Sequence, residues 1–420
     1  MKADARLAAL NDILAVAKRA PFYRARLDAA PLSSLEELAA LPITTKEDVR
    51  RHSPFGLVTA PSEAWYDYYE SFGTTGKPVS IWLTREDFDD TAREVARCGV
   101  ELGPGDLVLV RFPYAISQIA HVFHAAAHRR GACVIPASSR STISPFPRII
   151  RMMAELGVTV LACLPLQALL LAETAELMNL KPGRDFPKLR AICTAGEPLL
   201  PPRRSQLEEM WQVPIFDIYG MTEIGTAAVD GPCGRMHPLT DDFLFEILRE
   251  DLRAPAPPGE VGYLVITALR RRATPMIRYL TGDLACLVPE RCSCGAEFTL
   301  ELHGRKDDVV EVRGRTFDLW ELEAMVAAVP DRRLWVAGPL ENGAGLHFVV
   351  EAVNPGSLLS TVIEKRHERE YGIQVRIDLV PIGTLHDRAV LQEVGTVGKP
   401  RYVYTAAEMA AQAYRHNAKS

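Results

Sequence analysis

The sequence lacks any dense block of lysine or arginine, and its formal net charge is only −5. Nucleic acids and anionic membranes select clustered positive charge, so neither is expected as a main partner. The most apolar stretch, residues 158–172, is interrupted by Pro165 and Gln167 and is too short to span a bilayer. Residues 1–20 mix charges with alanine and leucine, which predicts an amphipathic helix and no secretion signal. A cytoplasmic location is therefore the default expectation.

Cysteine is also scarce, with eight residues among 420, which argues against a disulfide scaffold. Five cysteines stand singly among apolar residues, and we expect them to be buried core thiols. These five are Cys98, Cys133, Cys163, Cys193 and Cys286.

The other three cysteines suggest a metal site. Cys233 and His237 lie close together in sequence, and so do Cys292 and Cys294. Four such ligands would form a tetrahedral structural zinc site, and the neighbouring glycines 234 and 295 would permit the tight turns it needs. The alternative is a set of reduced surface thiols beside a hydrogen-bonded histidine.

No internal repeat or low-complexity tract interrupts the chain, and strand-like runs alternate with helical runs. This alternation predicts an α/β fold with a substantial parallel sheet. The expected strands are 107–112, 132–135, 158–162, 189–193 and 215–219, and the expected helices are 118–129, 149–156, 168–178 and 203–211.

The texture becomes β-rich after residue 231, which predicts a large domain over 1–306 with an antiparallel or barrel-like subdomain at about 231–304. Residues 307–420 show the pattern of a small α+β domain. Its expected strands are 334–337, 346–351 and 374–380, and its expected helices are 319–328 and 358–371.

The segment Ser71-Phe72-Gly73-Thr74-Thr75-Gly76-Lys77-Pro78 has the character of a phosphate-binding loop. Its glycines allow backbone N–H groups to converge on an anion, while hydroxyls and a lysine add donors. The glycine spacing and the proline differ from a Walker loop. The strand-like flanks 66–71 and 79–83 indicate that the loop joins two strands. A glycine-rich hairpin turn is the alternative.

This loop resembles the pyrophosphate-contacting loop of adenylate-forming enzymes. Residues 20–24 (Ala-Pro-Phe-Tyr-Arg) and 41–46 (Leu-Pro-Ile-Thr-Thr-Lys) resemble N-terminal segments of the phenylacetate–coenzyme A ligase branch. The resemblance continues in order along essentially the whole chain. It implies a large N-terminal domain and a small C-terminal domain that moves relative to it.

Further motifs acquire roles from this resemblance. In Tyr219-Gly220-Met221-Thr222-Glu223, at the end of an expected strand, Glu223 would hold Mg²⁺ and Thr222 would contact phosphate. Taken alone, the motif could equally be a helix N-terminus capped by Thr222. The resemblance also places the nucleotide against Ala195, Gly196, Glu197, Asp217, Tyr219, Gly220 and Met221.

The C-terminal motifs complete the implied site. Asp283 matches the carboxylate that accepts both ribose hydroxyls, and Arg305 matches a second ribose contact. Asp307 matches the hinge of the small domain, and Gly314 matches a glycine beside the coenzyme A path. Lys399, in Gly395-Thr396-Val397-Gly398-Lys399-Pro400, matches the lysine brought to the carboxylate and the α-phosphate.

The resemblance places the pocket for the acid around Phe112, Tyr114 and Ile116, with Ala195 and Gly220 on the adenine side. Phe112 and Tyr114 could stack an aryl group or could be ordinary core aromatics. Residues 138–142 are expected to form a polar loop. This loop could offer Arg140 to a substituted acid, or it could be an ordinary surface loop.

The implied activity is ATP- and Mg²⁺-dependent conversion of a carboxylic acid, aromatic by resemblance, to an acyl adenylate with release of pyrophosphate. Transfer to coenzyme A would then release AMP. A carrier-protein thiol, an amine or a hydroxyl remains an alternative acceptor, and a non-catalytic nucleotide-binding protein is a second alternative. A homodimer is also considered.

Overall fold

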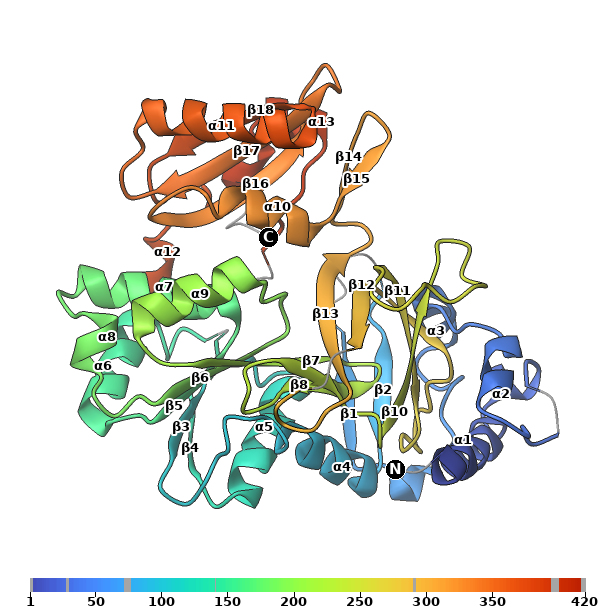
Figure 1. The fold of residues 1–420 in the computed structure, drawn as a ribbon. Helices are drawn as coiled ribbons and strands as arrows, with labels where there is room; N and C mark the ends of the chain where they lie inside the picture. The colour runs from blue at the N-terminus through green and yellow to red at the C-terminus, as the bar shows by residue number, and fades with distance from the viewer. Residues whose placement is uncertain are drawn as a thin grey trace.

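The computed structural model describes residues 3–27, 30–71, 77–139, 141–289, 292–393 and 400–416 (Figure 1). A C-terminal part lies above the helices α7 and α9 of the main body, and the N-terminal helices lie at the opposite end of that body. Among the described helices, every one is too short or too polar to cross a bilayer.

A seven-stranded sheet forms the centre of the body, in the order β4-β3-β5-β6-β7-β8-β9. The strands from β3 to β7 run parallel, whereas β8 and β9 return antiparallel, so the predicted α/β fold with a parallel-rich sheet is confirmed. The bounds are β3 (Leu107–Val110), β4 (Cys133–Pro136), β5 (Val160–Cys163), β6 (Ala191–Ala195), β7 (Ile215–Met221), β8 (Gly225–Asp230) and β9 (Met236–Pro238).

Helices cover both faces of this sheet because successive strand residues point to opposite sides. Val108 and Val110 face a core shared with α4 and α5, and Leu109 faces a second core shared with α6, α7 and α9. The helices are α4 (Arg85–Val95), α5 (Gln118–Arg129), α6 (Phe146–Leu156), α7 (Pro165–Leu177), α8 (Pro182–Asp185) and α9 (Pro201–Trp211).

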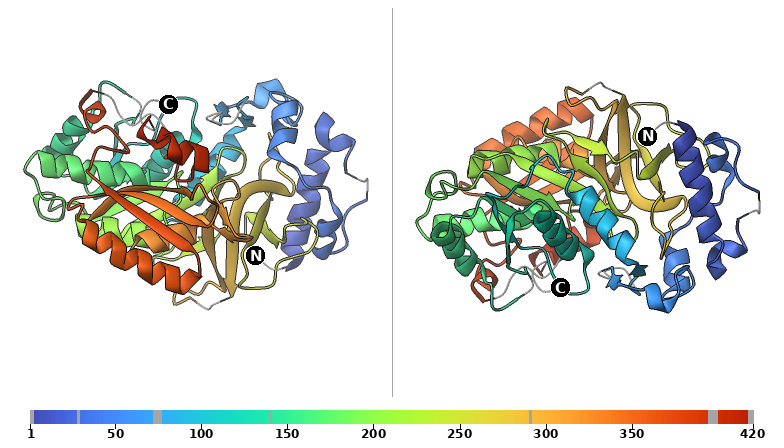
Figure 2. Two further views of the ribbon diagram at one scale, coloured as in Figure 1. Left: turned by 90° about the horizontal axis from the view of Figure 1, so that it is seen from above. Right: turned by 90° about the horizontal axis from the view of Figure 1, so that it is seen from below.

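A four-stranded antiparallel sheet, β10-β11-β12-β13, follows the central sheet in the chain, as the β-rich texture predicted. Figure 2 shows the N-terminal helices beside this second sheet, on the side away from α6 and α8. The elements are α1 (Ala3–Ala17), α2 (Pro21–Arg24), α3 (Lys46–His52), β10 (Phe243–Leu248), β11 (Gly262–Ala268), β12 (Tyr279–Pro289) and β13 (Phe298–Arg305).

Two hairpins form separate two-stranded sheets. The strands β1 (Asp67–Glu70) and β2 (Ser80–Leu83) pair antiparallel and flank the predicted phosphate loop, so the expectation that this loop joins two strands is confirmed. The strands β14 (Val310–Val312) and β15 (Arg315–Phe317) form a second, short hairpin at the start of the C-terminal part.

The C-terminal part contains a three-stranded sheet with its own core, as expected for a small α+β domain. Strand β17 pairs antiparallel with β16 and parallel with β18. The bounds are β16 (Arg332–Pro339), β17 (Gly345–Ala352), β18 (Gln374–Val380), α10 (Leu319–Val326), α11 (Ser357–Tyr371), α12 (Val390–Glu393) and α13 (Ala406–Ala410).

An ion-pair cluster, formed by Glu173, Arg333, Glu351 and Arg388, joins the C-terminal part to α7. Arg388 Nε donates to Glu173 Oε2 at 2.7 Å, and its Nη2 donates to Glu351 Oε2 at 2.7 Å. Arg333 Nε lies 3.4 Å from Glu173 Oε1. All four side chains are largely buried, so each charge depends on its partners for compensation.

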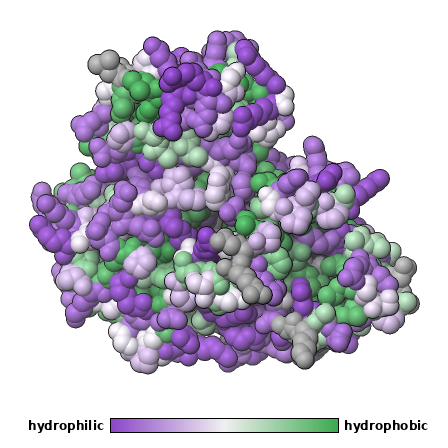
Figure 3. All heavy atoms as spheres, viewed as in Figure 1, coloured by the Kyte–Doolittle hydropathy of each residue, from purple (hydrophilic) through white to green (hydrophobic). Residues whose placement is uncertain are grey.

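One expectation about the cysteines was wrong. Cys133 is exposed, whereas Cys98, Cys163, Cys193 and Cys286 are buried as predicted. Cys133 begins β4, the edge strand of the central sheet, and one side of an edge strand is not covered by a neighbouring strand. Figure 3 shows that polar residues predominate on the face seen in Figure 1, with apolar side chains scattered among them.

Candidate active site

The candidate site includes the C-terminal end of β7. Tyr219, Gly220 and Met221 are the last residues of β7, and a tight turn through Thr222 and Glu223 leads directly into the antiparallel strand β8. The alternative of a helix capped by Thr222 is therefore wrong. Gly220 is required here because a Cβ atom would lie 2.2 Å from the carbonyl oxygen of Gly225.

Arg271 stabilises this turn by hydrogen bonding. Its Nε donates to the carbonyl oxygen of Ile224 at 3.0 Å, and its Nη2 donates to Glu94 Oε2 at 2.9 Å. Gly225 has a φ of 82°, and a Cβ atom there would collide with the guanidinium at 1.9 Å. The position of Glu223 thus depends on close packing of Gly220 against Gly225 and of Gly225 against Arg271, which pairs with Glu94.

The Glu223 carboxylate is almost fully buried and has two described partners. Tyr279 Oη donates to Glu223 Oε1 at 2.9 Å. Lys46 Nζ lies 3.7 Å from the same oxygen, with side chains 31% and 3% exposed for Lys46 and Glu223 respectively. Burial raises the pKa of the Tyr279 phenol well above its usual value, and the neighbouring Glu223 carboxylate adds to the rise.

Asp283 lies in the same neighbourhood, on β12. Tyr219 Oη donates to Asp283 Oδ2 at 2.7 Å, and Arg305 Nε lies 3.6 Å from Asp283 Oδ1. Asp283 and Arg305 are direct cross-strand partners on β12 and β13. Burial would lower the pKa of Arg305, but the surrounding carboxylates, Asp283 above all, outweigh it and raise this pKa. The structure therefore brings Tyr219, Glu223, Asp283 and Arg305 together.

The predicted adenine-side loop follows β6. Gly196 has a φ of 84°, and Glu197 Oε2 accepts a hydrogen bond from the Leu166 N–H at 3.1 Å, near the N-terminus of α7. Asp217 is buried, and its Oδ1 accepts from Thr194 Oγ1 at 2.5 Å. Burial, together with the nearby Asp230, raises the pKa of Asp217 to about 8. The Asp217 carboxylate therefore lies in a buried polar cluster with Thr194 and Asp230. Its role as a nucleotide contact stays a prediction.

The described ends of the phosphate loop close on each other. Val79 N–H donates to Ser71 Oγ at 2.9 Å, and Lys77 Nζ donates to the carbonyl oxygen of Ser53 at 3.3 Å. The middle of the predicted phosphate loop, together with Arg140 and Lys399, lies outside the described residues. The loop residues concerned are Phe72, Gly73, Thr74, Thr75 and Gly76.

The three residues expected around the acid differ in their surroundings. Phe112 has no exposed surface and packs edge-on against Phe123, as a core aromatic does. Tyr114 is half-buried, with its Oη 3.1 Å from His124 Nδ1, and Ile116 is 51% exposed. The histidines of α5 were not predicted as neighbours of Tyr114, although their helical spacing indicated a shared face.

The two C-terminal predictions are also located. Asp307 is exposed in the turn after β13. Arg313 and Gly314, with φ values of 52° and 79°, form the two-residue turn of the β14–β15 hairpin. A positive φ value favours glycine, so the backbone geometry of the turn is by itself a sufficient reason for Gly314.

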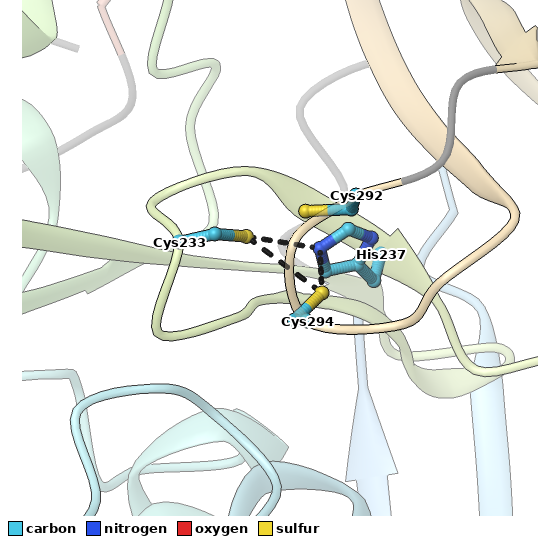
Figure 4. Close-up of side chains that lie close together, drawn as sticks. All are labelled: Cys233, His237, Cys292 and Cys294. Carbon is cyan, nitrogen blue, oxygen red and sulfur yellow. Dashed lines mark hydrogen bonds between the residues drawn. The ribbon is translucent and has the colours of Figure 1, made fainter.

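The predicted cysteine–histidine cluster is assembled (Figure 4). The ligand atoms of Cys233, His237, Cys292 and Cys294 all lie within 4.8 Å of one another. His237 Nε2 is 3.1 Å from both Cys233 Sγ and Cys294 Sγ, and its Nδ1 is 3.2 Å from the carbonyl oxygen of Phe298. Hydrogen bonds, first from the Cys294 backbone and then from Cys233, lower the pKa of Cys292 to about 6.

Comparison with known proteins settles the family. The family described as AMP-binding enzyme matches residues 57–269 of the chain. The chain belongs to the AMP-binding enzyme family. This AMP-binding enzyme is 33% identical over 329 residues to a phenylacetate–coenzyme A ligase of Thermus thermophilus, covering 75% of this chain and 73% of that protein. It is 31% identical to the phenylacetate–coenzyme A ligase of Escherichia coli strain K12, covering 70% and 68%. The predicted relationship to the phenylacetate–coenzyme A ligase branch is confirmed.

Solved structures confirm the fold. A 2-hydroxyisobutyryl-CoA ligase in the postadenylation state matches this AMP-binding enzyme with a TM-score of 0.87 and 23% identity, over 100% of this chain and 92% of that one. The same ligase in the thioesterification state gives a TM-score of 0.69 at 24% identity, over 98% and 92%. The overall arrangement here is thus closer to that in the postadenylation structure.

Proposed function

We propose that this enzyme activates a carboxylic acid with ATP and transfers the acyl group to coenzyme A, releasing pyrophosphate and then AMP. The observation that carries the proposal is the cluster of Tyr219, Glu223, Asp283 and Arg305, which the fold assembles from β7, the turn after β7, β12 and β13. The names of the relatives from Thermus thermophilus and Escherichia coli support both the reaction and an aromatic acid.

The arrangement suits a nucleotide for electrostatic reasons. Asp283 presents a carboxylate that can accept two hydroxyl hydrogen bonds, with Tyr219 and Arg305 fixing its orientation. Thr222 and Glu223 lie in the turn that ends β7, and Lys77 and Ser71 flank the loop that would donate to phosphate. Such preorganised donors stabilise the negative charge that develops on phosphoryl oxygens. We assign Lys399 to the carboxylate and the α-phosphate.

The surroundings of Glu223 fit a divalent cation. The side chain is a nearly buried carboxylate whose oxygen already faces one positive charge, that of Lys46, at 3.7 Å. Hard cations such as Mg²⁺ bind oxygen ligands of this kind and neutralise phosphate charge when bound. Tyr279 holds the carboxylate in place from the protein side.

The C-terminal part contributes the second half-reaction in this proposal. Rotation about Asp307 would withdraw Lys399 and bring the hairpin carrying Gly314 toward the site. Such a rotation has to break the pair between Arg388 and Glu173, which spans the two parts. The higher TM-score to the postadenylation structure supports the assignment of the described conformation to the adenylation half of the cycle.

Pyrophosphate exchange across a panel of aryl and aliphatic acids tests the first step. We expect exchange with at least one aryl acid, and we expect AMP to accumulate with that acid only when coenzyme A is added. Exchange without stimulation by coenzyme A would favour another acceptor, namely a carrier-protein thiol, an amine or a hydroxyl. ATP binding without exchange for any acid would favour the non-catalytic alternative. A homodimer and a cytoplasmic location stay predictions.

We also propose that Cys233, His237, Cys292 and Cys294 bind a structural zinc ion. A tetrahedral site with Zn–S bonds of about 2.3 Å separates sulfur atoms by about 3.8 Å, and Cys233 Sγ and Cys294 Sγ are 3.9 Å apart. The contact of His237 Nδ1 with the Phe298 carbonyl would leave Nε2 available as a ligand. Zinc would then tie the β8–β9 turn to the loop between β12 and β13.

Metal analysis tests the zinc proposal. We expect about one zinc per chain in the purified protein, and loss of zinc with a lower melting temperature in Cys292→Ser. Cys133→Ser, which changes an exposed cysteine outside the cluster, is the matched control. A Cys292→Ser protein that keeps its zinc and its melting temperature would exclude these ligands.

A further inference from the structure

The N-terminal segment delivers a lysine to the candidate site. Lys46 lies 177 positions before Glu223 in the sequence and precedes the matched family region, which begins at residue 57. Its ammonium nitrogen nevertheless lies 3.7 Å from Glu223 Oε1. The contact therefore depends on tertiary packing between the N-terminal segment and the main body.

Backbone pairing fixes the segment that carries Lys46. Thr44 forms an isolated parallel bridge with Tyr279, in which Thr44 N–H donates to the Arg278 carbonyl and Leu280 N–H donates to the Thr44 carbonyl, both at 2.9 Å. Thr44 Oγ1 also donates to the Ile277 carbonyl at 2.7 Å. Thr45 then caps α3 through a capping box, so Lys46 is the first residue of the helix. The same strand, β12, thus supports Lys46, Tyr279 and Asp283.

The charges explain why a lysine is useful at this point. The Glu223 side chain is only 3% exposed, and a buried carboxylate is costly unless a positive charge or hydrogen-bond donors compensate it. Tyr279 supplies a neutral donor, and Lys46 supplies charge. Lys46 approaches with 31% of its side chain exposed, so it reaches the carboxylate from the solvent side. Lysine carries a compact charge on a flexible stem, so its ammonium can change partner without movement of the backbone.

We propose that Lys46 is a positioning residue for Glu223 in the free enzyme and a cationic contact for the phosphates of bound ATP. The second role rests on the function proposed above. When Glu223 faces a divalent cation, its charge no longer requires the lysine. The ammonium would then be available to contact the negatively charged phosphates. Lys46 would thus complement Lys77 and Lys399, which come from other parts of the chain.

ATP binding measured by calorimetry in the absence of any acid tests this role directly. We expect Lys46→Met to weaken binding of ATP with Mg²⁺ by about 10-fold, the loss typical of one charged contact. We expect a smaller loss of ATP affinity when Mg²⁺ is left out, because the ammonium of Lys46 then stays paired with the Glu223 carboxylate. Lys46→Arg should restore most of the affinity. Lys18→Met is the matched control, since Lys18 is also half-buried and lies in the N-terminal segment.

A melting experiment tests the positioning role separately. Lys46→Met should lower the melting temperature of the nucleotide-free protein, and this effect should disappear in a Glu223→Gln background, where no charge needs compensation. A purely structural lysine would lower the melting temperature in both backgrounds and leave ATP affinity unchanged.

The outcomes separate this inference from the proposed function. If the wild-type enzyme binds ATP and exchanges pyrophosphate but Lys46→Met binds ATP with Mg²⁺ as tightly as the wild type, the phosphate contact is refuted while the function stands. If the two backgrounds show the same change in melting temperature, the positioning role is refuted. If the wild type neither binds ATP nor exchanges pyrophosphate, the proposed function fails together with the phosphate contact.

Discussion

Replacing Tyr279 by phenylalanine should destabilise the enzyme by removing one hydrogen bond to a buried carboxylate. The phenol has no exposed surface, and its hydroxyl donates to Glu223 Oε1 at 2.9 Å. Tyr279→Phe keeps the ring and the backbone bridge to Thr44, so only the hydroxyl is lost. Glu223 would then retain Lys46 as a charged neighbour at 3.7 Å.

The expected size follows from these contacts. A hydrogen bond to a charged group contributes about 1.5 to 3 kcal/mol net, and we expect the lower end because Lys46 still compensates part of the charge. An unfolding entropy of about 2 cal/mol/K per residue corresponds to about 0.9 kcal/mol/K for 420 residues. A loss of about 1.5 to 2 kcal/mol should therefore lower the melting temperature by about 2 °C.

Thermal unfolding of the nucleotide-free protein, followed by calorimetry, is the assay. Tyr404→Phe is the matched control, because Tyr404 is buried and no carboxylate bonds its hydroxyl among the described contacts. We expect the control to change the melting temperature by less than 1 °C. Equal melting temperatures for Tyr279→Phe and the wild type would show that the Tyr279 hydroxyl does not hold Glu223, and the reasoning about this carboxylate would be wrong.

Three other perturbations have defined outcomes. Asp283→Asn should raise the dissociation constant for ATP by about 10-fold or more, and calorimetry that finds unchanged affinity would contradict the ribose assignment. Arg388→Gln should destabilise the protein by about 3 kcal/mol because it leaves Glu173 and Glu351 buried without their shared cation, and an unchanged urea midpoint would refute this. The pKa of Asp217 rises from 3.8 to about 8 on folding, so the folded state holds a proton that the unfolded state releases, and stability should fall as pH rises from 4 to 8. Asp217→Asn should reduce this fall by more than about 1 kcal/mol, and identical pH profiles of the melting temperature would show that Asp217 is not its source.

Local pattern was sufficient for most of the fold. The helix predicted at 118–129 and the strand predicted at 374–380 have the bounds that the structure gives. In each case the apolar period and the flanking glycine or polar residues specify the element without reference to distant residues. The structure places Glu223 beside Tyr279, and the ligand site expected at residues 219–223 stays a prediction.

The features that were not predicted depend on contacts between distant residues. The antiparallel return of β8 depends on the fit of Gly220 against Gly225 and of Gly225 against Arg271, which no local period reveals. The exposure of Cys133 depends on which strand lies at the sheet edge. The pairing of Lys46 with Glu223 requires the bridge of the N-terminal segment to β12, and a single sequence does not specify such a register.

The ion-pair cluster at the base of the C-terminal part limits how freely this enzyme can be recombined with its relatives. Both of its arginines belong to the C-terminal part, whereas Glu173 lies on α7. A chimera that grafts the C-terminal part onto a related body without an acidic side chain at position 173 would leave the buried Arg388 without that partner and Arg333 with Glu176 alone on α7. An acidic residue at position 173 of the recipient is therefore expected to be needed for such a graft to pack without an uncompensated buried charge.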